Sequence, residues 1–78
     1  MSDGPAAVEV DLRGLPCPLN WARAKVRLER AERGERFAFL VDDPRSTRDM
    51  PRAAEASAYA VLAVEALAAG GWRIVIEA

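Results

Sequence analysis

The chain has 78 residues, of which 51% are hydrophobic. Its 11 basic and 12 acidic residues give a formal charge of −1. This charge excludes the strong basic field that sequence-independent nucleic-acid binding needs. This length is enough for one small domain. Because the chain has one cysteine and no histidine, it can form no internal disulfide and lacks the usual zinc ligand sets. We therefore expect no metal and no cofactor. A lone unpaired thiol suits the reducing environment of the cytoplasm, where we expect the protein to be.

Residues 1–7 include small residues, a glycine and a proline, and we expect them to form a flexible tail ahead of a single domain over residues 8–78. They have no basic region and do not resemble a signal peptide. No apolar run approaches the roughly 20 residues that span a bilayer, so we expect no membrane binding. In Val8–Leu12, apolar residues alternate with Glu9 and Asp11, which predicts a strand with one buried face.

The cysteine follows this strand in the segment Arg-Gly-Leu-Pro-Cys-Pro, residues 13–18. Proline is favoured at the first helical position, which predicts Pro18 at N1 and Cys17 at the N-cap. There the helix dipole and the free N–H groups of Leu19 and Asn20 favour the thiolate, the reactive form of cysteine. The alternative is that Cys17 is a small apolar core residue. Its two flanking prolines favour a position at an edge, so we take Cys17 as the candidate catalytic residue.

A helix is predicted from Pro18 to about Arg33, ending before Gly34 as a C′ glycine. Its apolar residues fall three and four positions apart and form one stripe, namely Trp21, Ala24, Leu28 and Ala31. Three arginines lie together on another side of this helix: Arg23, Arg27 and Arg30. They are either a solvated basic face or a docking edge for an acidic partner beside the cysteine.

The second half of the chain predicts two further strands and one helix, and leaves one segment open. Arg36–Asp42 is predicted as a strand with Phe37, Phe39 and Val41 on one face. A polar loop over residues 42–51 leads into a helix after Pro51 that ends near Ser57, capped by Asp49 or by Thr47. Trp72–Glu77 is a strand by alternation. Ser57–Ala69 suits a helix by propensity, whereas a strand over Ala60–Ala66 would give the order β-α-β-α-β-β, with two helices on one face of a four-stranded sheet.

Two segments, Val10–Pro18 with its following helix and Asp42–Pro51, resemble the two signatures of the TusA/SirA-like sulfur-carrier family, in the family's order and spacing. The resemblance extends from about Val8 to Glu77 and places a strand at Ala60–Ala66. It implies a two-layer α/β sandwich with a mixed sheet. It also implies that Cys17 accepts sulfane sulfur as a persulfide from a donor protein of the cysteine desulfurase or rhodanese type. An acceptor protein would then take that sulfur, without direct nucleic-acid or membrane binding.

The chain departs from the family's Cys-Pro-x-Pro motif, because Asn20 replaces the second proline. We hypothesise that Asn20 donates hydrogen bonds to Cys17 and stabilises its thiolate or persulfide anion. Arg13 either stabilises the same anion or pairs with Asp11 or Asp43. Arg45 and Asp49, together with Thr47, are expected to order the loop near the cysteine, with Asp49 favoured as a helix cap.

Three other classes of function compete with a sulfur carrier. The substitution at Asn20 favours a non-catalytic protein-interaction or regulatory module that keeps the fold without sulfur transfer. A metal chaperone of similar topology would need two cysteines close in sequence, and only one is present. An RNA-binding sandwich would need a basic patch and exposed aromatic residues on its sheet, which the sequence does not indicate.

Overall fold

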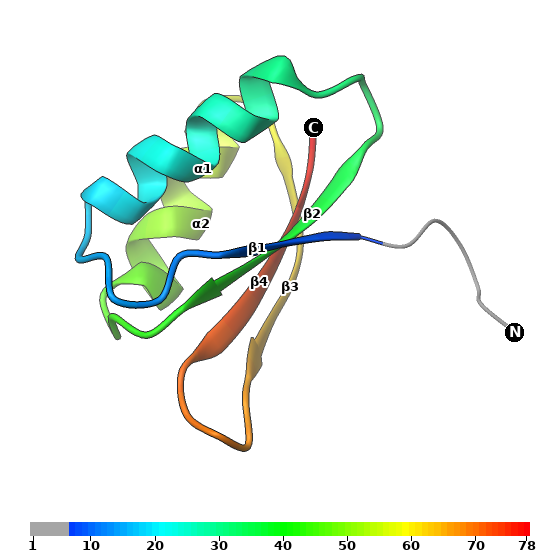
Figure 1. Ribbon diagram of the computed structural model, residues 1–78. Helices are drawn as coiled ribbons and strands as arrows, with labels where there is room; N and C mark the ends of the chain where they lie inside the picture. The colour runs from blue at the N-terminus through cyan, green and yellow to red at the C-terminus, as the bar shows by residue number, and fades with distance from the viewer. Residues whose placement is uncertain (1–6) are drawn as a thin grey trace, which may run out of the picture.

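The computed structural model describes residues 7–78, which form a four-stranded sheet and two helices. Both helices lie on the same face of the sheet (Figure 1). The elements in chain order are β1 (Val8–Asp11), α1 (Leu19–Arg30), β2 (Arg36–Val41), α2 (Ser46–Ala56), β3 (Ala60–Ala66) and β4 (Trp72–Glu77). This order confirms the predicted β-α-β-α-β-β sandwich, including the strand at Ala60–Ala66. The tail predicted for residues 1–7 lies outside the described residues except for Ala7.

The sheet has the strand order β1-β2-β4-β3. β1 runs parallel to β2, whereas β4 is antiparallel to both of its neighbours, so the sheet is mixed as expected. β1 therefore forms one outer edge of the sheet and β3 the other. A parallel pair needs a crossover connection, which α1 supplies.

The core lies between the sheet and the helices. Alternation in β2 points Phe37, Phe39 and Val41 toward the helices, and the two phenylalanine rings stack with their centroids 5.8 Å apart. The helices and β4 contribute further fully buried apolar side chains, Ala24, Met50, Ala54, Ile74 and Ile76. Both helices are thus held by one apolar face, and their N-terminal ends lie at the same end of the molecule (Figure 1).

The helix starts differ from the predicted ones. α1 begins at Leu19 with Pro18 as its N-cap, and it ends at Arg30 because Ala31 is extended, so Gly34 is not its C′ residue. α2 begins at Ser46, five residues before Pro51, which lies inside the helix. The reason is the turn before it: the Asp43 carboxylate accepts the Arg45 N–H at 3.0 Å and the Asp43 carbonyl accepts the Ser46 N–H at 2.9 Å. Neither Asp49 nor Thr47 is the cap.

Candidate functional site

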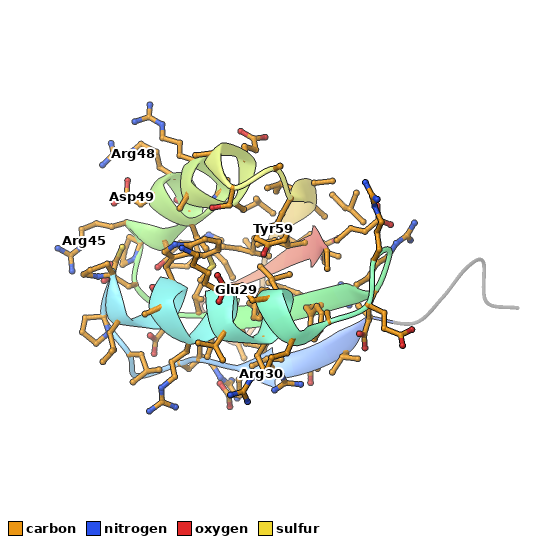
Figure 2. All side chains as sticks on the ribbon, turned by 90° about the horizontal axis from the view of Figure 1, so that it is seen from above. Glu29, Arg30, Arg45, Arg48, Asp49 and Tyr59 are labelled. Atoms are coloured by element: carbon orange, nitrogen blue, oxygen red, sulfur yellow. The ribbon has the colours of Figure 1, made fainter. Side chains whose placement is uncertain are left out.

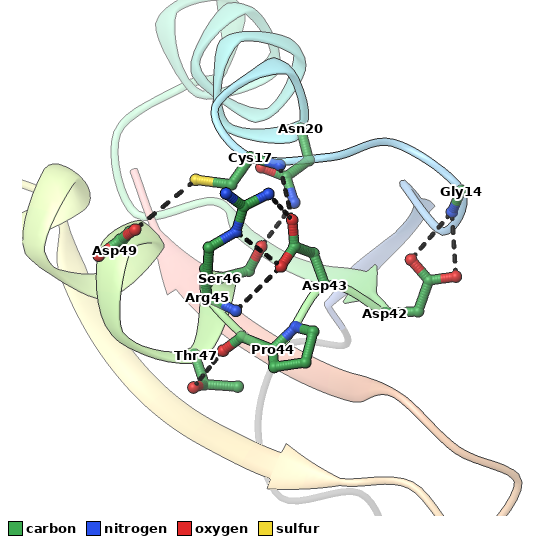
Figure 3. A network of polar contacts seen from close by, with 10 residues as sticks. All are labelled: Gly14, Cys17, Asn20, Asp42, Asp43, Pro44, Arg45, Ser46, Thr47 and Asp49. Atoms are coloured by element: carbon green, nitrogen blue, oxygen red, sulfur yellow. Dashed lines mark hydrogen bonds and ion pairs between the residues drawn. The ribbon is translucent and has the colours of Figure 1, made fainter.

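The two sequence motifs meet at one end of the sheet. Because β1 and β2 are parallel neighbours, the loops that follow them lie at the same end of the sheet. Figure 3 shows how carboxylates of the second loop bind backbone N–H groups of the first. The Asp42 carboxylate accepts the Gly14 N–H at 3.0 and 3.1 Å, and the Asp43 carboxylate accepts the Cys17 N–H at 3.0 Å. The second motif therefore positions the backbone of the first.

Cys17 is partly buried between these loops and the start of α2. Its Sγ lies 3.9 Å from the Asp49 Oδ2, within reach of a weak S–H hydrogen bond (Figure 3). Cys17 precedes the N-cap by one residue, so its predicted N-cap position is wrong by one. The Asn20 N–H, expected to be free near the sulfur, donates to the Pro16 carbonyl at 3.1 Å.

The surroundings of Cys17 favour the thiol over the thiolate. Burial is the largest cause that raises the pKa of Cys17, followed by the negative charge of Asp49, and the positive charge of Arg45 acts in the opposite direction. The expectation of a lowered pKa is therefore wrong. Its physical reason is first that the sulfur is partly buried, and second that it faces carboxylates from the second loop and α2. Local sequence around the cysteine indicates neither.

Arg45 and Asp43 form an ion pair beside the cysteine. The Arg45 guanidinium donates to both oxygens of Asp43, at 3.2 and 2.9 Å. These bonds, together with those from the N–H groups of Cys17 and Arg45, hold the pKa of Asp43 well below its usual range. The Asp43 side chain is only 12% exposed, whereas that of Arg45 is 61% exposed. The exposed guanidinium is thus available to an anion on Cys17 or on an incoming partner.

Asn20 makes no hydrogen bond to Cys17 within residues 7–78. Its side chain is fully buried, and its Nδ2 donates to the Ser46 Oγ at 2.6 Å, while its Oδ1 has no hydrogen-bond partner within residues 7–78. The reason is its helical position: Asn20, Ala24 and Leu28 are four residues apart and share the face of α1 that packs on the core. The hydrogen bond predicted from Asn20 to Cys17 is therefore not made, and Asn20 instead joins the start of α1 to the start of α2. Its effect on a sulfur anion at Cys17 stays a prediction.

Arg13 pairs with Asp11, one of the alternatives that the sequence left open. Its Nε and Nη2 donate to the Asp11 carboxylate at 2.9 and 2.8 Å. These hydrogen bonds lower the pKa of Asp11 to about 2. Arg13 is thus occupied at the end of β1 and is not hydrogen-bonded to Cys17.

The three arginines of α1 lie apart from the cysteine site. Arg23 and Arg27 line a groove of about 250 Å³ between α1 and β1, and the Arg27 guanidinium lies 5.6 Å from the centre of the Phe37 ring. Figure 2 shows Arg30 projecting from the side of α1 that faces away from α2.

Of the residues singled out in the sequence, Cys17, Arg45 and Asp49 come together. Sequence reasoning missed the carboxylate of Asp42 and the hydroxyl of Ser46. The available signal was the pair of adjacent aspartates directly after an apolar strand, where side chains reach the neighbouring loop. Over residues 7–78, no group of three or more histidine, cysteine, aspartate or glutamate side chains is placed to hold a metal ion. In the same range, no helix is long and apolar enough to cross a membrane.

Comparison with known proteins places this arrangement in a family. The chain is 34% identical over 68 residues to a protein of Archaeoglobus fulgidus named "putative sulfur carrier protein", covering 87% of this chain and 77% of that one. Its fold matches the crystal structure of a SirA-like protein from Desulfitobacterium hafniense with a TM-score of 0.79 and 29% identity, covering 91% of this chain and 96% of that one. The family model described as Sulfurtransferase TusA matches residues 8–78. The chain therefore belongs to the TusA family.

Proposed function

We propose that this protein is a sulfur carrier that accepts sulfane sulfur as a persulfide on Cys17 and relays it to a partner protein. Membership of the TusA family and the name of the Archaeoglobus relative support a carrier role. The observation that carries the assignment to Cys17 is its position. Both motifs converge on it, its backbone is fixed by Asp43, and its Sγ stands next to Asp49 and Arg45.

The proposed chemistry uses the two charged neighbours of the sulfur. As Cys17 attacks, its S–H proton passes to the Asp49 carboxylate, which acts as a general base. The thiolate forms a bond to the outer sulfur of a donor persulfide, the donor's S–S bond breaks, and the donor's inner sulfur leaves as a thiolate. The exposed Arg45 guanidinium then pairs with the persulfide anion on Cys17. No electrons are gained or lost overall, so this step needs no separate oxidant or reductant.

Unloading is the same exchange in reverse. A thiolate of the acceptor protein attacks the outer sulfur of the Cys17 persulfide, the S–S bond breaks, and Cys17 leaves as a thiolate that takes up a proton. We propose a cysteine desulfurase or a rhodanese-type protein as donor and a separate protein as acceptor. The reducing cytoplasm fits this cycle, because the lone thiol must stay free between loads.

The test is the intact mass of the protein after incubation with a sulfur donor. One sample receives a cysteine desulfurase with cysteine, and a second receives a rhodanese with thiosulfate. We expect a gain of one sulfur atom that a reductant reverses and that the Cys17→Ser variant lacks. If no donor adds sulfur while Cys17 still reacts with an alkylating probe, the carrier role is wrong and a protein-interaction module takes its place.

A further inference from the structure

The outer edge of β1 and the groove beside it form a second surface, separate from the cysteine. Its floor is apolar, with Val10, Leu12 and Val26 among the lining residues, and Val26 is 43% exposed. Arg23 and Arg27 stand on its α1 side. We call this surface the β1 groove. Its apolar floor and cationic rim together suit a ligand that carries both apolar and anionic groups.

The positive charge at the β1 groove is not neutralised within the described fold. The five ion pairs found over residues 7–78 involve other arginines, and none includes Arg23, Arg27 or Arg30. Asp11 also borders the groove, but alternation along β1 points its side chain to the face opposite Val10, where Arg13 binds its carboxylate. The Arg27 guanidinium rests on the Phe37 ring, which fixes the charge beside β1.

The backbone of β1 offers unused hydrogen-bonding groups along this groove. Among residues 7–78, β1 is an outer strand and pairs only with β2. The N–H of Leu12, the residue after the strand, donates to the Leu40 carbonyl of β2 at 2.8 Å. Backbone groups alternate in direction along a strand, so the N–H groups of Glu9 and Asp11 point away from β2. A further strand could use them as donors.

We propose that the β1 groove binds an extended acidic segment of a partner protein, which adds to the sheet as a strand beside β1. Side chains on one face of that segment would lie under α1, with an apolar residue on Val10 and Val26 and carboxylates on Arg23 and Arg27. Those on its other face would lie beside Glu9 and Asp11, which disfavours acidic residues there. This proposal rests on the proposed function in one respect: we take the partner to be a protein that gives or receives the sulfur.

The test uses two synthetic heptapeptides of the same composition. In Thr-Glu-Thr-Val-Thr-Glu-Thr, both glutamates and the valine share one strand face, whereas in Thr-Glu-Val-Glu-Thr-Thr-Thr the valine lies on the opposite face. Each is titrated into the labelled full-length protein and followed by backbone amide shifts. We expect the first peptide to bind more tightly, with the largest shifts in β1 and on α1 from Arg23 to Arg30. Equal affinities, or shifts that map to another surface, would overturn the proposal.

Two pairs of variants distinguish the contribution of the arginine charges to peptide binding from that of the backbone N–H groups of β1. Removing both charges in R23Q/R27Q should weaken binding of the first peptide about tenfold, whereas R52Q, an exposed arginine on α2, should not change it. Glu9→Pro removes a backbone N–H that points away from β2 and leaves the hydrogen bonds between β1 and β2 in place. It should abolish peptide binding, even though loss of the Glu9 negative charge by itself favours an acidic peptide. Its control, Glu9→Ala, should bind at least as tightly as the wild type. Unchanged binding by Glu9→Pro would refute strand addition.

The outcome is independent of sulfur chemistry. Loading of the wild-type protein by inorganic polysulfide requires Cys17 but no docked protein. If polysulfide loads Cys17 and the first peptide does not bind, the β1 groove proposal is wrong and the sulfur carrier stands. If the peptide binds as expected and Cys17 takes no sulfur from polysulfide or from either protein donor, the carrier role is wrong and the groove remains a protein-binding site.

Discussion

At the scale of single residues, the resting state of Cys17 depends on the charges around it. Burial and Asp49 raise the pKa of the thiol, and Arg45 opposes them. A protonated resting thiol is poorly reactive toward stray oxidants and electrophiles, because the thiolate is the nucleophile. Attack then requires that a base removes the proton while a donor is in place. Asp49, 3.9 Å from the sulfur, is positioned for that role.

The effect of these charges on the pKa of Cys17 can be measured directly. In Asp49→Asn, the nearby negative charge is lost, so we expect the pKa of Cys17 to fall. In Arg45→Gln, the nearby positive charge is lost, so we expect it to rise. The measurement is ultraviolet absorbance of the thiolate against pH, with Cys17→Ser as the baseline and R52Q as a control for loss of a distant charge. Shifts of the same sign in both variants would contradict this electrostatic account.

At the scale of elements, the Asn20–Ser46 hydrogen bond ties α1 to α2 beside the site. Asn20→Ala should destabilise the fold by about 1–2 kcal/mol, because it leaves the buried Ser46 hydroxyl without its partner. In a double-mutant cycle with Ser46→Ala, we expect a coupling free energy of about 1 kcal/mol. The free energies of unfolding come from urea denaturation. Additive single effects would show that the hydrogen bond contributes nothing.

The same variant discriminates between the two roles considered for Asn20. Because its side chain points into the core, Asn20→Ala should leave the pKa of Cys17 unchanged while lowering stability. A clear rise of that pKa in Asn20→Ala, measured by thiolate absorbance, would support the view that the amide stabilises the sulfur anion.

Asp43 joins the two loops, and its contribution should depend on pH in a defined direction. Its pKa is depressed in the folded protein, so the stability it contributes is present above its unfolded pKa and is lost as the pH falls from about 4 toward its folded value. The melting temperature of Asp43→Asn should therefore lie below that of the wild type at neutral pH and approach it at low pH. A difference that stays constant from neutral to acidic pH would show that the ionised carboxylate is not the cause.

The elements themselves show which parts of the fold are encoded locally. Alternation in Val8–Leu12 and Trp72–Glu77 predicted two strands, because the helices cover one face of each. Arg36–Asp42 was predicted as a strand with apolar residues on one face, and β2 is buried on both faces because it lies inside the sheet. Ala60–Ala66 could be assigned only from the family resemblance. Its alanines favour a helix in isolation, and pairing with β4 decides the outcome.

The parts that local patterns did not predict depend on contacts between distant residues. Asp43 starts α2 early and binds the N–H of Cys17, 26 residues before it in the chain. The side-chain direction of Asn20 follows from helix spacing, because Asn20 lies four residues before Ala24 on the buried face of α1. The raised pKa of Cys17 follows from burial and from carboxylates that only the fold brings near. Local sequence thus placed Cys17 at the meeting point of the two motifs but did not predict its environment.

At the scale of the whole molecule, the turn between β3 and β4 packs against the end of β2, the strand that leads into the cysteine site. Gly71 has φ +81°, and a Cβ there would lie 2.6 Å from the Val41 carbonyl oxygen, one residue before Asp42. Gly34 has a similar φ of +91° but open space around it. Alanine at Gly34 therefore adds backbone strain alone, whereas alanine at Gly71 adds the same strain and a steric clash with β2.

Gly34→Ala should cost about 1 kcal/mol, the strain of a left-handed residue, and leave the cysteine site intact. Gly71→Ala should cost about 3 kcal/mol or more, because the methyl group must also displace backbone of β2. That displacement moves Asp42, which binds Gly14 in the cysteine loop, so sulfur loading of Cys17 should fall in Gly71→Ala alone. Urea denaturation and the mass assay measure the two effects. Equal losses of stability in both variants would mean that the turn relaxes without moving β2, and the proposed connection from turn to site would not hold.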